Sequence, residues 1–235
     1  LVFTATYNEA ENIQEFITKL YKAENNLDLL IIDDNSPDKT YELIQKLCLK
    51  YSNIFLIKRE KKLGLNTAHI LAYDYAIKNK YDKFITLDAD MSHDPKDIPM
   101  IIKLLDKHAF VVGSRYMLGG KNDMTFFRYF ISYFGNILIK FLLKCKGTEF
   151  TTSYRGFNLI MLKDFHFNQI QAKGYSFFMN TVVKLNRLGF ESKEFPIHFK
   201  NRHHGKSKIP KIEIIRTLLN VLILYFKKWV TILQK

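Results

Sequence analysis

The sequence predicts an α/β fold in which a mostly parallel central sheet is flanked by helices. First, short apolar runs rich in β-forming residues alternate with segments of helical period over residues 1–113. Second, three of these runs end in polar or acidic residues, as expected where parallel strands reach the carboxyl edge of a sheet. Third, 235 residues with 47% hydrophobic content are enough to bury one sizeable core.

The predicted strands of the first half are short and apolar, and a helix is expected between each consecutive pair. The strands are expected at residues 1–5, 27–32, 53–57, 83–87 and 109–113. The helices are expected at residues 9–22, at 40–49, in a segment that ends near 78, and at 96–107. Asn8 is the expected N-cap of the first helix, with Glu9 and Glu11 in its first turn.

Two carboxylates follow the predicted strand at residues 83–87. Asp88 and Asp90 stand one residue apart, and Ser92 and His93 come soon after. Such oxygen ligands suit a hard divalent cation, Mg²⁺ or Mn²⁺, which could neutralise a diphosphate. A solvated acidic turn has the same pattern, so these residues alone leave both interpretations open.

Polar residues also follow the first two predicted strands. The ring of Tyr7 could stack on a base, and acids such as Asp33 and Asp34 can bind a ribose hydroxyl or a base edge. An ordinary turn that caps the next helix explains the acids equally well. Lysines of the loop 58–64 precede a helix, which suits a phosphate. Neither G-x-G-x-x-G nor the P-loop signature is present, so neither of those folds is supported.

The second half adds apolar helices. Helices are expected within residues 124–146 and 174–188, and strands at 158–161 and 194–199. Residues 209–235 contain an apolar run of about half the ~20 residues that span a bilayer, followed by Lys227-Lys228-Trp229. This end of the chain is expected to form an amphipathic helix at a membrane interface, or else a helix packed on the domain.

Positive charge is concentrated in the second half. The net charge is +13, but residues 1–114 hold 15 Lys and Arg against 17 Asp and Glu, whereas residues 115–235 hold 21 against 6. A basic half rich in Phe and Tyr can meet nucleic acid, an anionic membrane or a phosphorylated substrate. Two cysteines give no disulfide framework, which favours a reducing, cytosolic setting. The chain has no signal-peptide pattern, and because it opens without Met inside a strand, a few upstream residues are expected.

Seven short motifs occur in one order along the chain. They are Thr6-Tyr7-Asn8-Glu9, Asp33-Asp34-Asn35-Ser36-Pro37-Asp38, Lys62-Leu63-Gly64-Leu65, Asp88-Ala89-Asp90, Gly113-Ser114-Arg115-Tyr116, Arg155-Gly156-Phe157 and Arg202-x-x-Gly205-x-Ser207-Lys208. Taken together, they resemble the polyprenol-phosphate (dolichol-phosphate) mannosyltransferases, inverting members of glycosyltransferase family 2 with the GT-A fold. The resemblance implies a GT-A domain at residues 1–208, followed by the helix at 209–235.

The resemblance also implies roles for residues that bind the donor. The donor-nucleotide-binding residues would be Tyr7, Glu9, Asp34, Asp88, Arg202, Ser207 and Lys208. Asp88 and Asp90 would hold Mg²⁺ or Mn²⁺, with Asp90 as the closer ligand, and Ser92 could supply a side chain or a water. His203 and His204 are expected to be solvated loop residues, because the acids already account for a hard cation.

The catalytic residues implied by the resemblance are Asp90, Arg115, Arg128 and Ser132. The last three match positions that bind the phosphate of the lipid acceptor. Arg128 and Ser132 share a helix face, and guanidinium groups pair bidentately with phosphate. Aromatic and aliphatic surroundings suit a prenyl chain or a membrane interface. The family usually has Glu at the position of Asn180, and an amide can neither take a proton nor hold a metal as a carboxylate does, so donor preference stays open.

The expected reaction transfers mannose from GDP-mannose to a polyprenyl or dolichyl monophosphate with inversion. A UDP-sugar donor of the glucose type is an alternative within the enzymes. A non-catalytic basic protein that binds a membrane or a nucleic acid is the alternative from another class. The Q-x-x-R-W pattern of processive synthases is absent, which disfavours polymer synthesis. The expected location is the cytoplasmic face of a membrane, with a membrane-anchoring subunit or further C-terminal spans as additions that the sequence leaves open.

Overall fold

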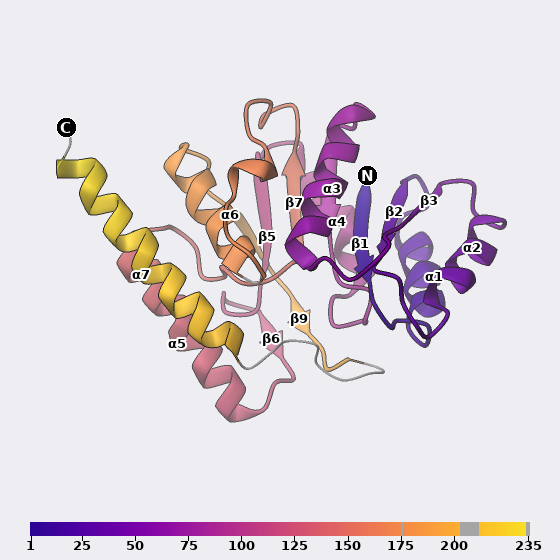
Figure 1. Ribbon diagram of the computed structural model, residues 1–235, viewed down its shortest axis with the longest axis horizontal. Coiled ribbons are helices and arrows are strands. Elements are labelled where there is room, and N and C mark those ends of the chain that lie inside the picture. Colours follow the sequence, from indigo (N-terminus) through magenta and orange to yellow (C-terminus); the bar gives the residue numbers. More distant parts are fainter. Residues whose placement is uncertain (175, 203–211, 234–235) are drawn as a thin grey trace.

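A seven-stranded sheet lies between two layers of helices in the computed structural model, which describes residues 1–174, 176–202 and 212–233 (Figure 1). Across the sheet the strands are β3 (Ile54–Lys58), β2 (Leu29–Asp33), β1 (Val2–Thr6), β4 (Lys83–Thr86), β7 (Arg155–Asn158), β5 (Phe110–Ser114) and β8 (Lys193–Pro196). Neighbouring strands are parallel except at β7, which runs antiparallel to both β4 and β5. The predicted α/β fold with a mostly parallel sheet is confirmed.

Successive side chains of a strand point to opposite faces of the sheet, and each face has its own core. Phe3 and Leu30 belong to one core, whereas Val2 and Leu29 belong to the other. The first core includes residues of α3 (Leu65–Lys78), α5 (Phe126–Leu143), α6 (Ser176–Arg187) and α7 (Ile212–Leu233). The second core includes residues of α1 (Ile13–Ala23), α2 (Thr40–Cys48) and α4 (Ile98–Leu105), which follows the short helix η1 (Pro95–Asp97).

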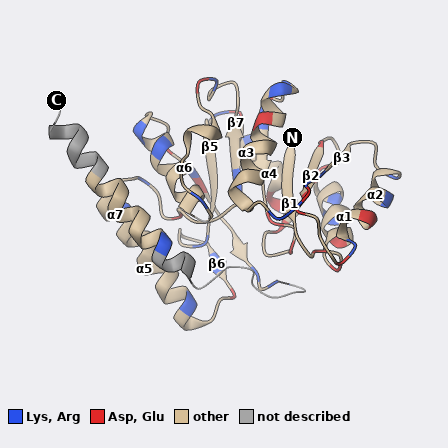
Figure 2. Ribbon diagram, in the orientation of Figure 1, with Lys and Arg blue, Asp and Glu red and all other residues tan. Residues whose placement is uncertain are grey.

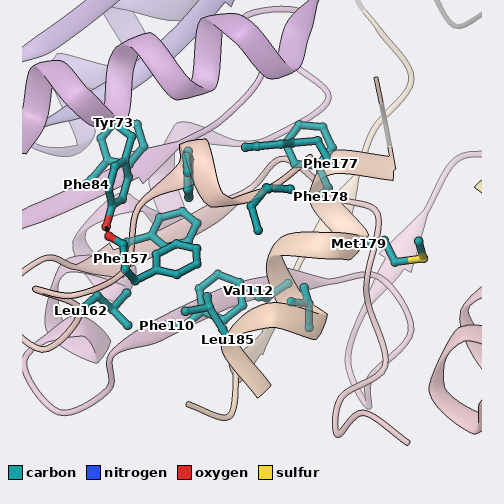
Figure 3. Close-up of a cluster of buried hydrophobic side chains, with 14 of the residues drawn as sticks. Tyr73, Phe84, Phe110, Val112, Phe157, Leu162, Phe177, Phe178, Met179 and Leu185 are labelled. Atoms are coloured by element: carbon teal, nitrogen blue, oxygen red, sulfur yellow. Dashed lines mark hydrogen bonds between the residues drawn. The ribbon is translucent and has the colours of Figure 1, made fainter. Parts of the chain in front are cut away.

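The first core is built around aromatic rings (Figure 3). Tyr73 of α3 stacks on Phe167 of the short helix η2 (Phe167–Gln169), with 4.3 Å between ring centroids. The edges of Phe84 and Phe157 meet the same tyrosine ring at nearly right angles. Each such pair adds about 0.5–1.5 kcal/mol beyond the burial of its area. These contacts fix α3 against β4 and β7, the strands that carry the candidate site.

The first helix starts later than the sequence predicts. It begins at Ile13 with Asn12 at its N-cap. Asn8 lies before the helix and has a left-handed backbone, with φ of 57°. The backbone N–H of Asn8 donates to Ser36 Oγ at 3.0 Å, and that of Glu9 donates to Thr40 Oγ1 at 3.0 Å. The expected cap at Asn8 is therefore wrong, because the turn after β1 is tied to the loop between β2 and α2.

Two predicted strands of the second half also differ. The strand expected at 158–161 lies at Arg155–Asn158 instead, because its register is set by pairing with β4 and β5. The apolar residues Ile160 and Met161 lie in the turn after it and are exposed. The strand expected at 194–199 is two strands, β8 and β9 (His198–Phe199), and β9 pairs with β6 (Lys121–Asn122) in a small second sheet. The other predicted elements agree with the structure to within a few residues.

Helices α5 and α7 lie side by side on the flank of the molecule opposite α1 and α2 (Figure 1). Asn220 of α7 donates from Nδ2 to Oδ1 of Asn180 on α6 at 2.6 Å, so the residue that departs from the family pattern lies at a contact between helices. Large apolar side chains of α5 are exposed, including Phe126 at 82% and Phe127 at 73%. In the described part of the chain, α5 is the helix long and apolar enough to cross a membrane by length and composition.

Candidate active site

The carboxyl ends of β1, β2 and β4 lie side by side, because these parallel strands are neighbours in the sheet. Tyr7, Asp34 and Asp88 follow closely after these three strands. Strand β7 runs the opposite way, so the residues that precede it come to the same edge. Segments distant in sequence therefore meet where open α/β sheets bind their ligands.

Asp90 is buried, with 3% of its surface exposed, and both of its carboxylate oxygens have partners. Oδ1 accepts hydrogen bonds from the backbone N–H of Ser92 at 3.0 Å and from its hydroxyl at 2.5 Å. Oδ2 forms an ion pair with Nε of Arg202 at 2.9 Å. A buried anion needs such partners, since an isolated one would lose its hydration without compensation.

Asp88 is more open, with 36% of its side chain exposed, and its Oδ1 accepts a hydrogen bond from Ser153 Oγ at 2.7 Å. Its backbone N–H donates to Nδ1 of His93 at 3.1 Å. In the neutral ring Nε2 then carries the proton and faces Thr152 Oγ1 at 3.3 Å. Burial lowers the pKa of His93 below 6.5, although Asp88 and Asp90 oppose the shift. The neutral histidine therefore fixes the backbone of the acidic turn.

The donor set of the acidic turn fits a hard divalent cation. Asp88 and Asp90 offer carboxylate oxygens, and the turn already stabilises one positive charge, the guanidinium of Arg202. Within residues 1–174, 176–202 and the described side chains of α7, His, Cys, Asp and Glu form no cluster of three or more that could hold a metal. A bound phosphate or water could supply further ligands of a cation here.

Asp34 lies at the carboxyl end of β2 in a buried ion pair with Arg59. The same guanidinium donates from Nη1 to Thr67 Oγ1 at 2.6 Å and from Nη2 to the Gly64 carbonyl at 3.2 Å. Burial raises the pKa of Asp34 above its ordinary 3.8, although Arg59 opposes the shift. Arg59 thus ties the predicted nucleotide-binding acid to the loop that precedes α3.

Tyr7 and Glu9 lie in the loop that follows β1, beside the loop after β2. The ammonium group of Lys62 lies 4.1 Å from the centroid of the Tyr7 ring, a cation–π contact. The carboxylate of Glu9 is buried and accepts a hydrogen bond from Asn12 Nδ2 at 2.7 Å. The structure thus brings both predicted residues to the same edge as Asp34.

Arg115 follows β5 and is buried against Glu149. Its Nε and Nη2 donate to the two carboxylate oxygens of Glu149 at 2.8 and 2.9 Å, and Nη2 also donates to Thr151 Oγ1 at 3.0 Å. Burial alone would raise the pKa of Glu149, but the guanidinium and its hydrogen bonds more than offset this and hold the pKa below 4.5. A predicted phosphate-binding arginine is therefore already paired with a buried carboxylate.

Ser132 of α5 lies next to this pair. The hydroxyl of Tyr116 donates to Ser132 Oγ at 2.6 Å, and the Tyr116 ring lies 5.2 Å from the guanidinium carbon of Arg115. Arg128 is exposed and lies one turn before Ser132 on α5. The structure thus connects Arg115 and Ser132 through Tyr116, and places Arg128 on the same helix as Ser132.

The segment after β9 crosses the acidic turn. Lys200 donates its backbone N–H to the Ser92 carbonyl at 3.1 Å, and its Nζ to Asp94 Oδ2 at 2.9 Å. Two residues later Arg202 reaches Asp90. The predicted donor-binding residues Ser207 and Lys208, together with His203 and His204, lie outside the described residues.

Sequence-based prediction missed two residues of the site, Arg59 and Glu149, and the role of a third, Arg155. The Arg155 guanidinium donates to the carbonyls of Thr152, Phe178 and Phe150 at 2.7, 2.6 and 2.9 Å, and so fixes the loop before β7. A signal for Glu149 was available, because residues 115–235 hold only 6 acids and this one lies close to the Arg155 motif. No such signal was available for Arg59, because it stands among lysines in a stretch that resembles a solvated loop.

Comparison with known proteins shows the family to which the chain belongs. Residues 1–165 match the profile of glycosyl transferase family 2. The chain belongs to glycosyltransferase family 2. Within it, the chain is 30% identical over 222 residues to the undecaprenyl-phosphate mannosyltransferase of Micrococcus luteus, covering 94% of this chain and 91% of the relative.

Two further relatives have similar descriptions. The polyprenol monophosphomannose synthase of Mycolicibacterium smegmatis is 30% identical over 224 residues, which cover 94% of this chain and 84% of the relative. The dolichol-phosphate mannosyltransferase of Pyrococcus furiosus is 31% identical over 226 residues, but these cover only 62% of that longer protein.

Solved structures agree on the fold. The mannosyltransferase PcManGT of Pyrobaculum calidifontis, in complex with GDP-Man and Mn²⁺, is 15% identical with a TM-score of 0.58 over 98% of this chain and 63% of its own. TarS of S. aureus in complex with UDP is 14% identical with a TM-score of 0.61 over 95% of this chain and 64% of its own. At such identities the likeness concerns the fold, and the predicted GT-A fold is confirmed.

Proposed function

We propose that this enzyme transfers mannose from GDP-mannose to a polyprenyl monophosphate and inverts the anomeric centre. The observation that carries the proposal is the meeting of two chemically different sets of residues at one edge of the sheet. Asp34, Asp88 and Asp90 form an acidic side suited to a nucleotide and a cation, whereas Arg115 lies near Ser132 of the exposed apolar helix α5, connected to it through Tyr116. The names of the curated relatives support the choice of mannose and of a polyprenyl phosphate.

The donor would lie over the ends of β1 and β2. Tyr7 and Asp34 would contact the nucleoside, with Asp34 held in place by Arg59. Asp88 and Asp90 would hold a divalent cation, Mg²⁺ or Mn²⁺, which when bound supplies positive charge that stabilises the departing diphosphate. Arg202 would contribute a guanidinium to the same diphosphate.

The acceptor phosphate would bind between Arg115, Arg128 and Ser132. A phosphate monoester has a second pKa near 6, so its oxygen is already charged near neutral pH and needs no strong protein base. The arginines would neutralise the phosphate and hold the attacking oxygen in line with the anomeric carbon. The bond from the anomeric carbon to that oxygen forms as the bond to the diphosphate breaks, which inverts the centre.

Membrane association follows from the acceptor and from the surface around it. Exposed apolar side chains cover α5 and the described part of α7, including Phe126, Phe127, Phe141 and Leu219. Helix α5 holds Arg128 and Lys140 and no acid, and Figure 2 shows positive charge on this flank of the molecule. An apolar face edged by positive charge suits the boundary of an anionic bilayer, and the positive charge favours the cytoplasmic leaflet.

Radiolabelled sugar transfer tests the proposal. The chain is incubated with Mg²⁺ or Mn²⁺, a short polyprenyl phosphate, and labelled GDP-mannose or UDP-glucose in parallel, and label in the organic phase is counted. Metal-dependent label from GDP-mannose is expected, with loss in Asp90→Ala and Arg128→Gln. Lys140→Gln removes the same charge from α5 three turns from Arg128 and should retain activity. If label appears only from UDP-glucose, the assigned donor is wrong. If label appears from neither donor, the proposal is overturned.

A further inference from the structure

Arg202 occupies an oxygen of Asp90 that a divalent cation would need. Its Nε lies 2.9 Å from Oδ2, and Ser92 takes Oδ1 with two hydrogen bonds. The Asp90 side chain is 4% exposed and that of Arg202 is 25% exposed. A cation that coordinates Oδ2 would lie against the guanidinium of Arg202, and the repulsion between the two positive charges favours displacement of Arg202, the partner that is charged and partly open to solvent.

Contacts of the neighbouring residues bring Arg202 to this position. Phe199 of β9 pairs with Asn122 of β6, and the backbone N–H of Lys200 donates to the Ser92 carbonyl inside the acidic turn at 3.1 Å. The Lys200 side chain is not part of this backbone contact and pairs with Asp94 at 2.9 Å instead. Arg202 thus lies two residues after a backbone contact with the acidic turn. This contact holds its guanidinium near Asp90 at a high effective concentration.

Resting on the proposed function, we propose that Arg202 and the divalent cation exchange on Asp90. Without metal, the guanidinium neutralises the buried carboxylate. When metal and donor bind, the guanidinium leaves Oδ2 and pairs with the donor diphosphate, so one arginine serves two anions in turn. Without the donor, the metal competes with the guanidinium of Arg202 for Asp90 and therefore binds weakly. When the donor is bound, its diphosphate offers Arg202 another anion, and Asp90 is released for the metal. Donor and metal then strengthen each other's binding by the same factor.

Manganese binding to the whole chain tests the exchange without any sugar transfer. Free Mn²⁺ is measured by electron paramagnetic resonance during a titration, with and without GDP. The variants are Arg202→Gln and the matched control Lys200→Gln. Both remove one positive charge from the same segment, but Lys200 pairs with Asp94 and not with Asp90.

Arg202→Gln is expected to bind Mn²⁺ about fivefold or more tightly than wild type in the absence of GDP. Lys200→Gln should change this affinity by less than about twofold, since its charge acts only through a partly exposed pair. The factor by which GDP strengthens Mn²⁺ binding should be smaller in Arg202→Gln than in wild type. Unchanged or weaker Mn²⁺ binding in Arg202→Gln, or an equal gain in Lys200→Gln, would overturn the exchange.

Sugar transfer by the wild-type chain, measured separately, distinguishes this proposal from the proposed function. If the wild-type chain transfers the sugar but Arg202→Gln has an unchanged Mn²⁺ affinity, the exchange is overturned and the proposed function stands. The expected Mn²⁺ shifts together with no transfer overturn the assigned reaction and support the exchange.

Discussion

Glu149 holds Arg115 through two parallel hydrogen bonds of 2.8 and 2.9 Å, in a position where the glutamate has no exposed surface. The same carboxylate accepts the backbone N–H of Thr152 at 3.1 Å. One residue further on, Ser153 donates to Asp88 at 2.7 Å. The acceptor side and the donor side of the candidate site are therefore joined by one short loop.

Glu149→Gln should destabilise the fold and weaken acceptor binding. The amide keeps the size of the side chain but leaves the buried Arg115 without a counter-charge, which costs about 3–5 kcal/mol. Urea denaturation measures the loss, and the KM for polyprenyl phosphate should rise more than the KM for the donor. Glu191→Gln is the control, because Glu191 forms an exposed pair with Lys146 and should change stability by less than about 0.5 kcal/mol. Equal rises in both KM values would contradict a positioning role for Glu149.

Replacement of His69 should flatten the acid dependence of stability. His69 is buried against Phe3 and Phe178, and burial, with a smaller effect of Arg155, lowers its pKa from 6.5 to about 3. The unfolded chain therefore takes up a proton below pH 6.5 that the folded chain refuses, and stability falls as the pH drops from 6.5 towards 3. The contribution is about 5 kcal/mol at most, reached only below the folded-state pKa.

The measurement for His69 is urea denaturation of wild type and His69→Leu at pH 7.5, 6, 5 and 4. The difference in unfolding free energy between the two proteins should move in favour of the leucine variant as the pH falls. A difference that stays constant over this range would show that the histidine takes up its proton in the folded state as easily as in the unfolded one.

Arg59→Met should weaken donor binding by about tenfold, or ~1.4 kcal/mol. The change removes the partner of Asp34 and the bonds to Thr67 and Gly64 that shape the loop before α3. Kinetics at varied GDP-mannose should show the rise in KM, with the KM for the acceptor unchanged. Lys58→Met is the matched control, because Lys58 is exposed and contacts Tyr41 instead. A normal donor KM in Arg59→Met would refute this role.

The exposed aromatic side chains of α5 should bind lipid bilayers. Phe126→Ser combined with Phe127→Ser is expected to reduce co-sedimentation with vesicles of phosphatidylserine and phosphatidylcholine by about tenfold or more, since each exposed ring loses apolar contact with the bilayer. Thermal unfolding should be unchanged, because neither ring is buried. Leu49→Ser alters an equally exposed residue, 88% exposed beside α2 on the opposite flank, and should leave vesicle binding intact (Figure 1). Comparable losses in both variants would argue against α5 as the contact.

The sequence predicted what depends on local pattern. Apolar runs that end in polar or acidic residues placed β1, β2 and β4, and with them the acidic turn at Asp88 and Asp90. Helical periodicity placed α5 and therefore the shared helix of Arg128 and Ser132. The roles given to these residues remain predictions until binding and kinetics are measured.

The sequence could not predict what depends on distant partners. Arg59 reads as one cation in a basic loop, and its importance comes from a buried contact with Asp34 25 residues away. Glu149 lies 34 residues from Arg115, and only the insertion of β7 between β4 and β5 brings them together. The strand expected at 158–161 was misplaced for the same reason, because partners on both sides set its register.

The position of β7 has a consequence for fragments of the chain. The charge changes sign near residue 114, which would suggest an acidic module followed by a basic one. Yet β4 and β5 do not pair with each other and are bridged by Arg155–Asn158, which lies beyond that boundary. A fragment that ends at Ser114 would leave the edge of β4 and both edges of β5 open, and exposed apolar edges invite aggregation. The two halves of opposite charge are therefore one folding unit, whose sheet is complete only after the ribosome has passed β8 at residue 196.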